Sequence, residues 1–390
     1  MNEINNITYI EGLLADYFSD NLSLRGKAFD SIRQLNDNEN INKLLTELEK
    51  YFTTHNLSNR NLSFDIYIYF KDNSIPFLEK LLSHIDKDIR KVSTELLIAL
   101  NSKKSVDKIL PLITDEDENV RYSAIEAIGK LGSYIQIPYL FEYYQELPEY
   151  RHVLLSAIGD IGVENSEEFV FSVLNSTDDL FLKMSAIDAI GKVGQSEKAL
   201  YFLVEDIQTS DEELMPLYLK AIYNIALRMG LNFEIPDPIR HIVYNSLNQN
   251  DEDYLLNALK LINNDIRQED LEYFNSKFLI SNPKIRTQLI QNLCNIESQY
   301  IYSLFLDKLS SNIIELYSFE DFTLDLINNF KNYEVNNNFE ILTRNLKYLI
   351  EFILDNEKLN FILLLESLSD SFEFQTKDIL AEIKKLRKKD

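Results

Sequence analysis

Small apolar residues recur at helical spacing between residues 115 and 132, in the segment DEDENVRYSAIEAIGKLG. Their separations of three and four residues place them on one side of a helix. The positions concerned are Val120, Ala124, Ala127, Ile128 and Leu131. Because this side is narrow and rich in small residues, the pattern predicts a helix that another helix can approach closely.

Both ends of the predicted helix are marked in the sequence. Asp115 or Asp117 can cap its start, because a short acidic side chain accepts hydrogen bonds from the first free backbone amides. Gly132 follows the last apolar residue, at a place where helices commonly end in a left-handed glycine. We therefore expect a short helix with well-defined ends.

The same arrangement recurs along the chain. We count each copy, or frame, from one residue near the start of its helix, and this residue is basic in most frames. Three, six and seven residues after this first residue stand mostly small or apolar residues, and in the frames from Arg121, Arg151 and Lys183 two glycines follow. The frames start at Arg25, Arg90, Arg121, Arg151, Lys183, Tyr218, Leu255 and Arg286. Seven of the nine glycines occupy the two glycine positions: Gly129, Gly132, Gly159, Gly162, Gly191, Gly194 and Gly230. The pattern therefore indicates a repeated unit.

A second apolar segment lies between successive frames, as in SIPFLEKLLSHI and QIPYLFEYYQEL. Each unit is thus predicted to be a pair of antiparallel helices, repeated at roughly 30 to 37 residues, the range of helical solenoids. Neither helix can bury its apolar side alone. The sequence therefore predicts an all-α solenoid in which about eight stacked pairs share one core.

Three segments carry a resemblance to a known family: VRYSAIEAIGKLG, YRHVLLSAIGDIG and LKMSAIDAIGKVG. They resemble HEAT repeats of the short kind first described in phycobilisome lyases. The resemblance is clear from about residue 75 to residue 230 and fades towards both ends. It implies a right-handed superhelix whose second helices line the concave side. It does not imply an activity, because the same solenoid serves enzymes and scaffolds alike.

Composition and charge narrow the classes of protein. Gly and Pro are scarce, which agrees with a helical fold, and a net charge of -24 repels phosphate backbones, so nucleic acid is not expected as a partner. The single cysteine, Cys294, cannot form an internal disulfide, and its place in a helix interior favours packing over catalysis. No signal peptide or membrane span is evident, so we expect a cytoplasmic protein that does not bind membranes.

The specialised enzymes with this solenoid need residues that the sequence lacks. The di-iron hydroxylases use His-Glu pairs, but the four histidines precede Asn56, Ile85, Val153 and Ile242. The DNA glycosylases need a basic groove with stacking aromatics, whereas this acidic chain has no tryptophan. A phycobilin lyase needs Arg or Lys in its groove to hold propionates. We therefore expect no catalytic residue, no bound metal and no cofactor.

The recurring bases have two interpretations. Arg90, Arg121, Arg151 and Lys183 could form a basic binding stripe. Each of them also follows a turn with acidic residues, so they could instead form a ladder of ion pairs and carbonyl contacts that fixes the register of neighbouring repeats. We favour the ladder.

The residues left over on the second helices form the candidate binding face. Positions one, two and five after the base point away from the buried side. The candidates are Tyr122, His152, Met184, Leu219 and Tyr223, flanked by Glu95, Glu126 and Asp188. They would suit a protein segment with apolar anchors among Lys or Arg residues. The alternative is that these side chains pack against the next repeat.

Three regions and a function follow from these patterns. Divergent helical repeats are expected in residues 1–74, the regular solenoid in 75–295, and a less regular helical cap in 296–390. We expect a non-enzymatic scaffold or adaptor that binds another protein. The alternatives are an acidic inhibitor of the immunity type, which would sequester a basic enzyme, and a chromophore-binding protein similar to a phycobilin lyase.

Overall fold

A computed structural model of the chain describes residues 2–52, 56–230, 235–248, 251–262, 265–267, 270 and 283–294. The regular elements of these ranges are all helices. The chain divides into two compact units, Met1–Val193 and Gly194–Asp390. The predicted cap at 296–390 lies outside the described residues, and the predicted boundaries at 74 and 295 stay predictions.

Over its described residues, the N-terminal unit has six successive helix pairs whose members contact each other. They are α1 (Asn2–Tyr17) with α2 (Leu22–Arg33), α3 (Asn38–Phe52) with α4 (Leu57–Phe70), α5 (Ile75–Leu81) with α6 (Lys87–Ala99), α7 (Val106–Ile109) with α8 (Glu118–Leu131), α9 (Ile137–Glu146) with α10 (Arg151–Ile161), and α11 (Glu167–Ser176) with α12 (Leu180–Val193). The predicted solenoid of helix pairs is therefore confirmed.

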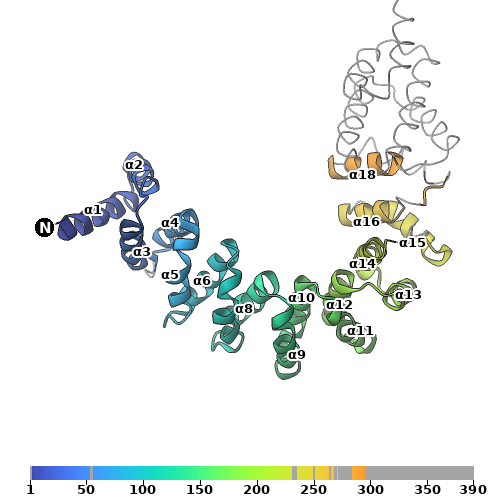
Figure 1. Cartoon of the computed structure of the whole chain (residues 1–390). Coiled ribbons are helices and arrows are strands. Elements are labelled where there is room, and N and C mark those ends of the chain that lie inside the picture. Colours follow the sequence, from blue (N-terminus) through green and yellow to red (C-terminus); the bar gives the residue numbers. More distant parts are fainter. Residues whose placement is uncertain are drawn as a thin grey trace, which may run out of the picture. The chain divides into compact units, whose positions relative to one another are not determined.

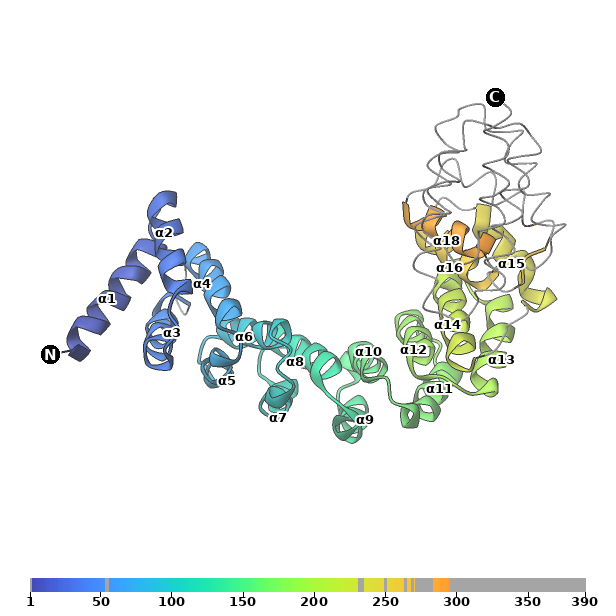
Figure 2. The ribbon, with the colours of Figure 1, turned by 45° about the horizontal axis from the view of Figure 1, so that its top comes forward.

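The second helices of the last four pairs form a continuous row, in which α6 contacts α8, α8 contacts α10 and α10 contacts α12. We call these four helices the even row. Their partners α5, α7, α9 and α11 lie in a separate layer along one side of it (Figures 1 and 2). The even row therefore joins these four repeats, and between α9 and α11 the rings of Phe141 and Phe169 also stack, with centroids 4.1 Å apart.

The C-terminal unit continues the same scheme over its described residues. Its pairs are α13 (Glu197–Asp206) with α14 (Met215–Arg228) and α15 (Asp237–Asn248) with α16 (Glu252–Ile262), followed by α18 (Pro283–Cys294). Again the second helices touch directly, because α14 contacts α16 and α16 contacts α18.

The core of the even row is the apolar side that the sequence pattern predicts. All five predicted positions of α8 are buried, from Val120 to Leu131. The third, sixth and seventh positions of the other frames are buried as well: Ser93, Leu96 and Leu97 in α6, Leu154, Ala157 and Ile158 in α10, and Ala186, Ala189 and Ile190 in α12. The period of the pattern thus identified the buried side of each helix.

Glycine allows the helices of the even row to approach closely. A Cβ atom on Gly129 would lie 2.8 Å from the Cα of Ala157, and one on Gly159 would lie 2.9 Å from the Cα of Ala189. Real Cβ atoms do not come so near to backbone carbon, since packed atoms already touch at larger distances. A glycine of each helix therefore faces an alanine of the next.

The glycines at the helix ends differ from one another. Gly162 adopts the predicted left-handed conformation, with φ of 70°. Gly132 does not, because its φ is -70° and its amide donates to the carbonyl of Ile128 at 2.8 Å. A Cβ on Gly132 would lie 2.4 Å from that carbonyl oxygen. Close approach, and not a positive φ, is what requires glycine there.

Aromatic side chains make prominent contacts in and beside the first four helices. The rings of Phe18 and Tyr51 stack with centroids 4.0 Å apart, and the fully buried Phe52 meets the ring of Tyr67 edge-on at 5.2 Å. The first pairs are therefore joined by large contacts and not by small ones.

Candidate functional site

The charged ladder is complete between α6 and α8. Arg90 binds Asp115 with two parallel hydrogen bonds, Nε to Oδ2 at 2.8 Å and Nη2 to Oδ1 at 2.7 Å. Its Nη1 donates to the carbonyl of His84 at 2.9 Å. The two paired side chains are only 7% and 8% exposed. Arg90 therefore joins its own loop to the next repeat, as the ladder interpretation predicts.

The carboxyl of Asp115 is held in its charged form. Burial alone would raise the pKa of this group, but the hydrogen bonds from Arg90 and from the amide of Asp117 outweigh burial and lower the pKa below its usual value. The pair is thus satisfied on both sides, which a buried ion pair requires if it is not to destabilise the fold.

The second step of the ladder uses an aromatic acceptor. Arg121 donates from Nη1 to the carbonyl of Asp115 at 2.6 Å and from Nε to the hydroxyl of Tyr150 at 2.7 Å. Its guanidinium also lies over the Tyr150 ring, 5.0 Å from the centroid. This arginine, too, fixes two neighbouring repeats and is not part of a basic stripe.

In the third step, Arg151 contacts the helix that precedes its own. Arg151 donates from Nε to the carbonyl of Tyr144 at 3.0 Å and lies 5.1 Å from the centroid of that ring. Within the described part of the chain, its two Nη groups have no hydrogen-bond or ion-pair partner on the α11–α12 side. The ladder is therefore interrupted between α10 and α12.

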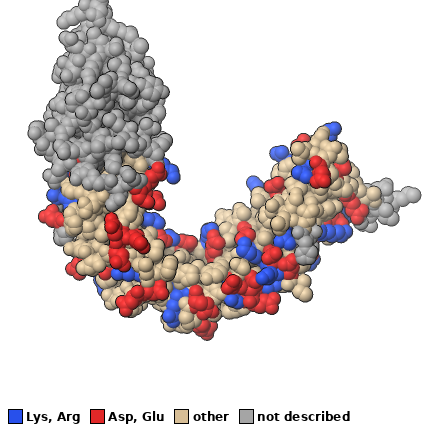
Figure 3. Space-filling model, turned by 180° about the vertical axis from the view of Figure 1, so that it is seen from behind, with Lys and Arg blue, Asp and Glu red and all other residues tan. Residues whose placement is uncertain are grey.

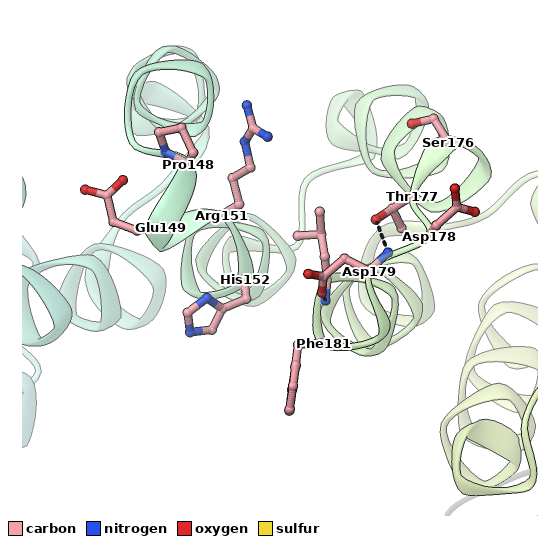
Figure 4. Close-up of a pocket in the computed structure, with 10 residues that line it drawn as sticks. Pro148, Glu149, Arg151, His152, Ser176, Thr177, Asp178, Asp179 and Phe181 are labelled. Atoms are coloured by element: carbon pink, nitrogen blue, oxygen red, sulfur yellow. Dashed lines mark hydrogen bonds between the residues drawn. The ribbon is translucent and has the colours of Figure 1, made fainter.

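A cleft of about 640 Å³ lies at this interruption. Its lining includes Arg151 and His152 from α10, Thr177, Asp178 and Asp179 from the turn before α12, and Phe181 from the first turn of α12. Figure 4 shows the Arg151 side chain on one side of the cleft and the turn with Thr177 and Asp178 on the other. Within this unit, the cleft brings unpaired charge next to an exposed aromatic ring.

Three of the predicted face residues occupy equivalent positions on neighbouring helices. Tyr122 on α8 and Met184 on α12 are 38% and 37% exposed, and His152 on α10 is half-buried. The Tyr122 ring lies 6.1 Å from the His152 ring and 5.0 Å from the ring of Tyr150. We call Tyr122, His152 and Met184 the strip.

The predicted acidic flank is paired with lysines of its own helices. Lys91 binds Glu95 at 2.6 Å, Lys130 binds Glu126, and Lys192 binds Asp188 at 2.6 Å. Figure 3 shows one side of the molecule, on which Lys and Arg are interspersed with Asp and Glu over the N-terminal unit. Sequence reasoning missed these lysines, although their spacing of four residues is the signal for such pairs.

The two remaining candidates belong to the C-terminal unit. Leu219 is fully buried, so the expectation of an exposed side chain is wrong. The buried side of α14 also includes Tyr218 and Leu219, so it is wider than the spacing of the frame indicates. Tyr223 is half-buried, and the ammonium of Lys260 lies 5.8 Å from its ring centroid. The structure therefore leaves the strip as the candidate face of the N-terminal unit.

Candidate metal sites and candidate membrane-spanning helices are both absent from the described part of the molecule. No group of three or more His, Cys, Asp or Glu side chains there could hold a metal ion. None of the described helices has both the length and the apolar character that a bilayer crossing requires. The side chain of Cys294, for which packing was predicted, lies outside the described part.

Comparisons with known proteins agree with this architecture. A family model described as HEAT repeats matches residues 75–151. A crystal structure of importin beta is similar with a TM-score of 0.54 at 13% identity, and the match covers 94% of this chain and 64% of that one. The chain thus spans less than two thirds of the length of importin beta. A comparison with curated proteins found no match.

Two further solved structures are similar at low identity. The structure of Kap95p with RanGDP matches with a TM-score of 0.51 at 10% identity, over 95% of this chain and 60% of that one. The complex of CpcE and CpcF of phycocyanin lyase from Nostoc sp. matches with a TM-score of 0.39 at 14% identity, over 67% of this chain and 96% of that one. The first likeness concerns the fold alone, and the second is too weak to support an argument.

Proposed function

We propose that this HEAT-repeat protein is a non-enzymatic scaffold or adaptor that binds another protein on the exposed side of its even row. The observation that carries the proposal is the strip, in which Tyr122, His152 and Met184 stand at equivalent positions of three packed helices. Aromatic and methionine side chains are enriched in protein interfaces, because they bury a large area when a partner covers them.

The rigidity of the strip supports binding. Gly129 and Gly159 hold α8, α10 and α12 at a fixed close distance, and Arg121 and Tyr150 tie the bases of α8 and α10 together. A preorganised surface loses less conformational entropy when a partner docks. The strip therefore has the properties of an interface without needing to rearrange.

The partner that suits this face is a segment with apolar anchors and basic residues. The net charge of -24 favours the approach of a basic partner over long distances. Close to the strip, however, the lysine pairs of Glu95, Glu126 and Asp188 offset much of the local charge. Apolar contacts are therefore the main source of affinity, and charge mainly governs the rate of association.

The comparison with Kap95p gives the proposal a parallel. That protein has a similar helical solenoid and is described in a complex with RanGDP. The parallel supports the use of such a solenoid for binding proteins, and it does not identify the partner of this chain.

A second candidate function has one observation in its favour. An acidic inhibitor that covers a basic enzyme would gain from the charge of -24, because opposite charges accelerate association. Such an inhibitor would bind much more slowly at high salt. A scaffold that relies on the strip would lose little of its affinity under the same conditions.

The test is a double substitution, Tyr122→Ala with Met184→Ala. A partner identified by cross-linking and mass spectrometry is purified, and its affinity is measured by calorimetry. We expect binding to weaken by more than about 2 kcal/mol, because buried aromatic anchors dominate such interfaces. Tyr134→Ala is the control, since this tyrosine is even more exposed but precedes α9 in the other layer. Equal affinity of the double variant and the control would exclude the strip.

A further inference from the structure

We propose that the cleft between α10 and α12 receives a Lys or Arg residue of an extended partner segment, while Arg151 donates to a backbone carbonyl of that segment. The proposal rests on the function proposed above and assigns a second contact next to the strip. It follows from the interrupted ladder, from the charges around the cleft, and from the position of His152.

The interruption has an identifiable cause in one residue. Asp115 accepts from the amide two residues later, that of Asp117, at 2.9 Å, and its carboxylate also receives Arg90. Thr177 occupies the same local position, because its Oγ1 accepts from the amide of Asp179, also two residues later, at 3.2 Å. Threonine keeps the turn but offers no carboxylate to Arg151. The guanidinium is therefore left for an acceptor from outside the chain.

A backbone carbonyl is the acceptor that arginines in this molecule use most regularly. Arg25 donates to the carbonyl of Ser19 at 2.8 Å, and Arg90 and Arg121 each donate to carbonyls of the turn before their helix. A planar guanidinium with several donors suits such acceptors. An extended segment in the cleft would present carbonyls to the free Nη groups of Arg151 without requiring an anion.

The charges around the cleft favour a basic residue over an acidic one. Glu149, Asp178 and Asp179 line it together with Arg151, so negative side chains outnumber the guanidinium. Glu149 and Asp178 are exposed and have no ion-pair partner in the described part of the chain. These carboxylates would repel a carboxylate ligand of Arg151. A partner segment with a Lys or Arg side chain can pair with the carboxylates, while one of its backbone carbonyls accepts from Arg151.

The cleft is continuous with the strip. His152 lines the cleft and its ring also contacts that of Tyr122, while Phe181 at the start of α12 is 74% exposed. Large exposed aromatic rings next to unpaired polar groups are typical of binding surfaces. One extended segment can therefore place an apolar side chain on the strip and a basic one in the cleft.

The test is a selection of phage-displayed random peptides on the full chain, followed by affinity measurement with the selected peptides. Thr177→Asp supplies Arg151 with the carboxylate that Asp115 gives to Arg90. We expect the selected peptides to carry Lys or Arg near an apolar residue and to bind this variant at least tenfold more weakly. Thr177→Ser keeps the hydroxyl of the turn and should bind like the wild type.

A second pair of variants does not depend on the turn. Asp178→Lys should also weaken the binding of the basic peptides at least tenfold. Glu168→Lys, at an exposed site on α11, should leave their affinity unchanged. If Thr177→Asp lowers the melting temperature, this pair decides the question.

The outcomes separate the two proposals. Selected peptides rich in Asp or Glu, or unchanged affinity for Thr177→Asp and Asp178→Lys, would overturn the cleft assignment. If the Tyr122→Ala, Met184→Ala double variant nevertheless failed to bind these peptides, the proposal that the strip is a binding face would still hold. Failure of the wild-type chain to select any peptide would count against both.

Discussion

The first four helices and the helices α8, α10 and α12 solve the same packing problem with opposite residues. In the first region, rings such as Phe18 with Tyr51 and Phe52 with Tyr67 fill the space between helices. In the second, Gly129 and Gly159 remove the space, and the backbones come almost into contact. One architecture thus accommodates both large and small residues between its helices.

The difference teaches where each region is vulnerable. An aromatic contact is large, so its loss leaves a cavity, but a smaller apolar side chain can fill part of that cavity. A glycine-alanine contact has no spare volume, so one additional carbon forces the helices apart. We therefore expect truncation to damage the first region and enlargement to damage the second.

Phe52→Ala should have the largest effect on stability. The side chain is fully buried between the rings of Phe64 and Tyr67, so truncation should cost about 3 to 5 kcal/mol, measured by urea denaturation with circular dichroism. Phe52→Leu is the control and should cost clearly less. Similar losses for both variants would show that ring geometry, and not volume, holds this region together.

The charged ladder adds a dependence on pH to the comparison. Arg25 in the first region bonds to carbonyls, whereas Arg90 on α6 also bonds to the carboxylate of Asp115, just before α8. Asp115→Asn should destabilise the protein by about 1.5 to 3 kcal/mol at pH 7, because it removes charge-assisted hydrogen bonds but keeps a polar side chain. The folded state lowers the pKa of Asp115, so the stabilisation is present above the unfolded pKa of about 4 and is lost as pH falls further.

The measurement is a pair of denaturation series between pH 7 and pH 2. The curves of wild type and Asp115→Asn should begin to converge below about pH 4 and should meet once the pH falls below the lowered pKa of Asp115 in the folded state, where this carboxyl also becomes neutral. A constant difference across the whole range would mean that the charge of Asp115 does not stabilise the fold.

Glycine substitutions should differ in sign between the two regions. Gly159→Ala should cost about 1 to 3 kcal/mol, because its Cβ would lie 2.9 Å from the backbone of Ala189. Gly26→Ala in α2 has free space around its Cβ and should stabilise by up to about 1 kcal/mol, since alanine favours the helix. Melting temperatures of both variants check the contrast. A loss at Gly26 as large as that at Gly159 would contradict it.

Much of this architecture was predictable because burial follows the helical period. Val120, Ala124 and Ile128 are three or four residues apart, and a single helix suffices to place them together. Leu219 was not predictable in this way, because the buried side of α14 includes Tyr218 and Leu219 in addition to the positions that the period selects. A local pattern identifies the centre of the buried side, and it does not show how wide that side becomes once the neighbouring helices cover it.

The interruption of the ladder could also not be predicted from the sequence, because the residues that form the ladder have no fixed spacing. Arg90 meets its partner 25 residues later, whereas Arg121 meets Tyr150, 29 residues later. The forward acceptor therefore depends on how each turn folds. Only the equivalent hydrogen bonds of Asp115 and Thr177 reveal that the two residues share a position.

The exposed strip should matter least for stability. Tyr122→Ala with Met184→Ala should change the free energy of unfolding by no more than about 0.5 kcal/mol for each substitution, because both side chains remain partly in solvent. Thermal denaturation checks this. A loss of several kcal/mol would mean that the strip packs as part of the core of the even row.

The shared direction of the even helices has an electrostatic consequence. Since an odd helix returns the chain before each of them, α6, α8, α10 and α12 all begin at the same edge of the N-terminal unit. Their backbone dipoles add there, and Asp86, Asp117 and Asp179 accept the first free amides. Part of the negative charge of the molecule thus neutralises its own helix ends. The local field at this edge is therefore weaker than the carboxylates alone would produce, whereas the net charge that acts at a distance is unchanged, because a helix dipole adds no net charge.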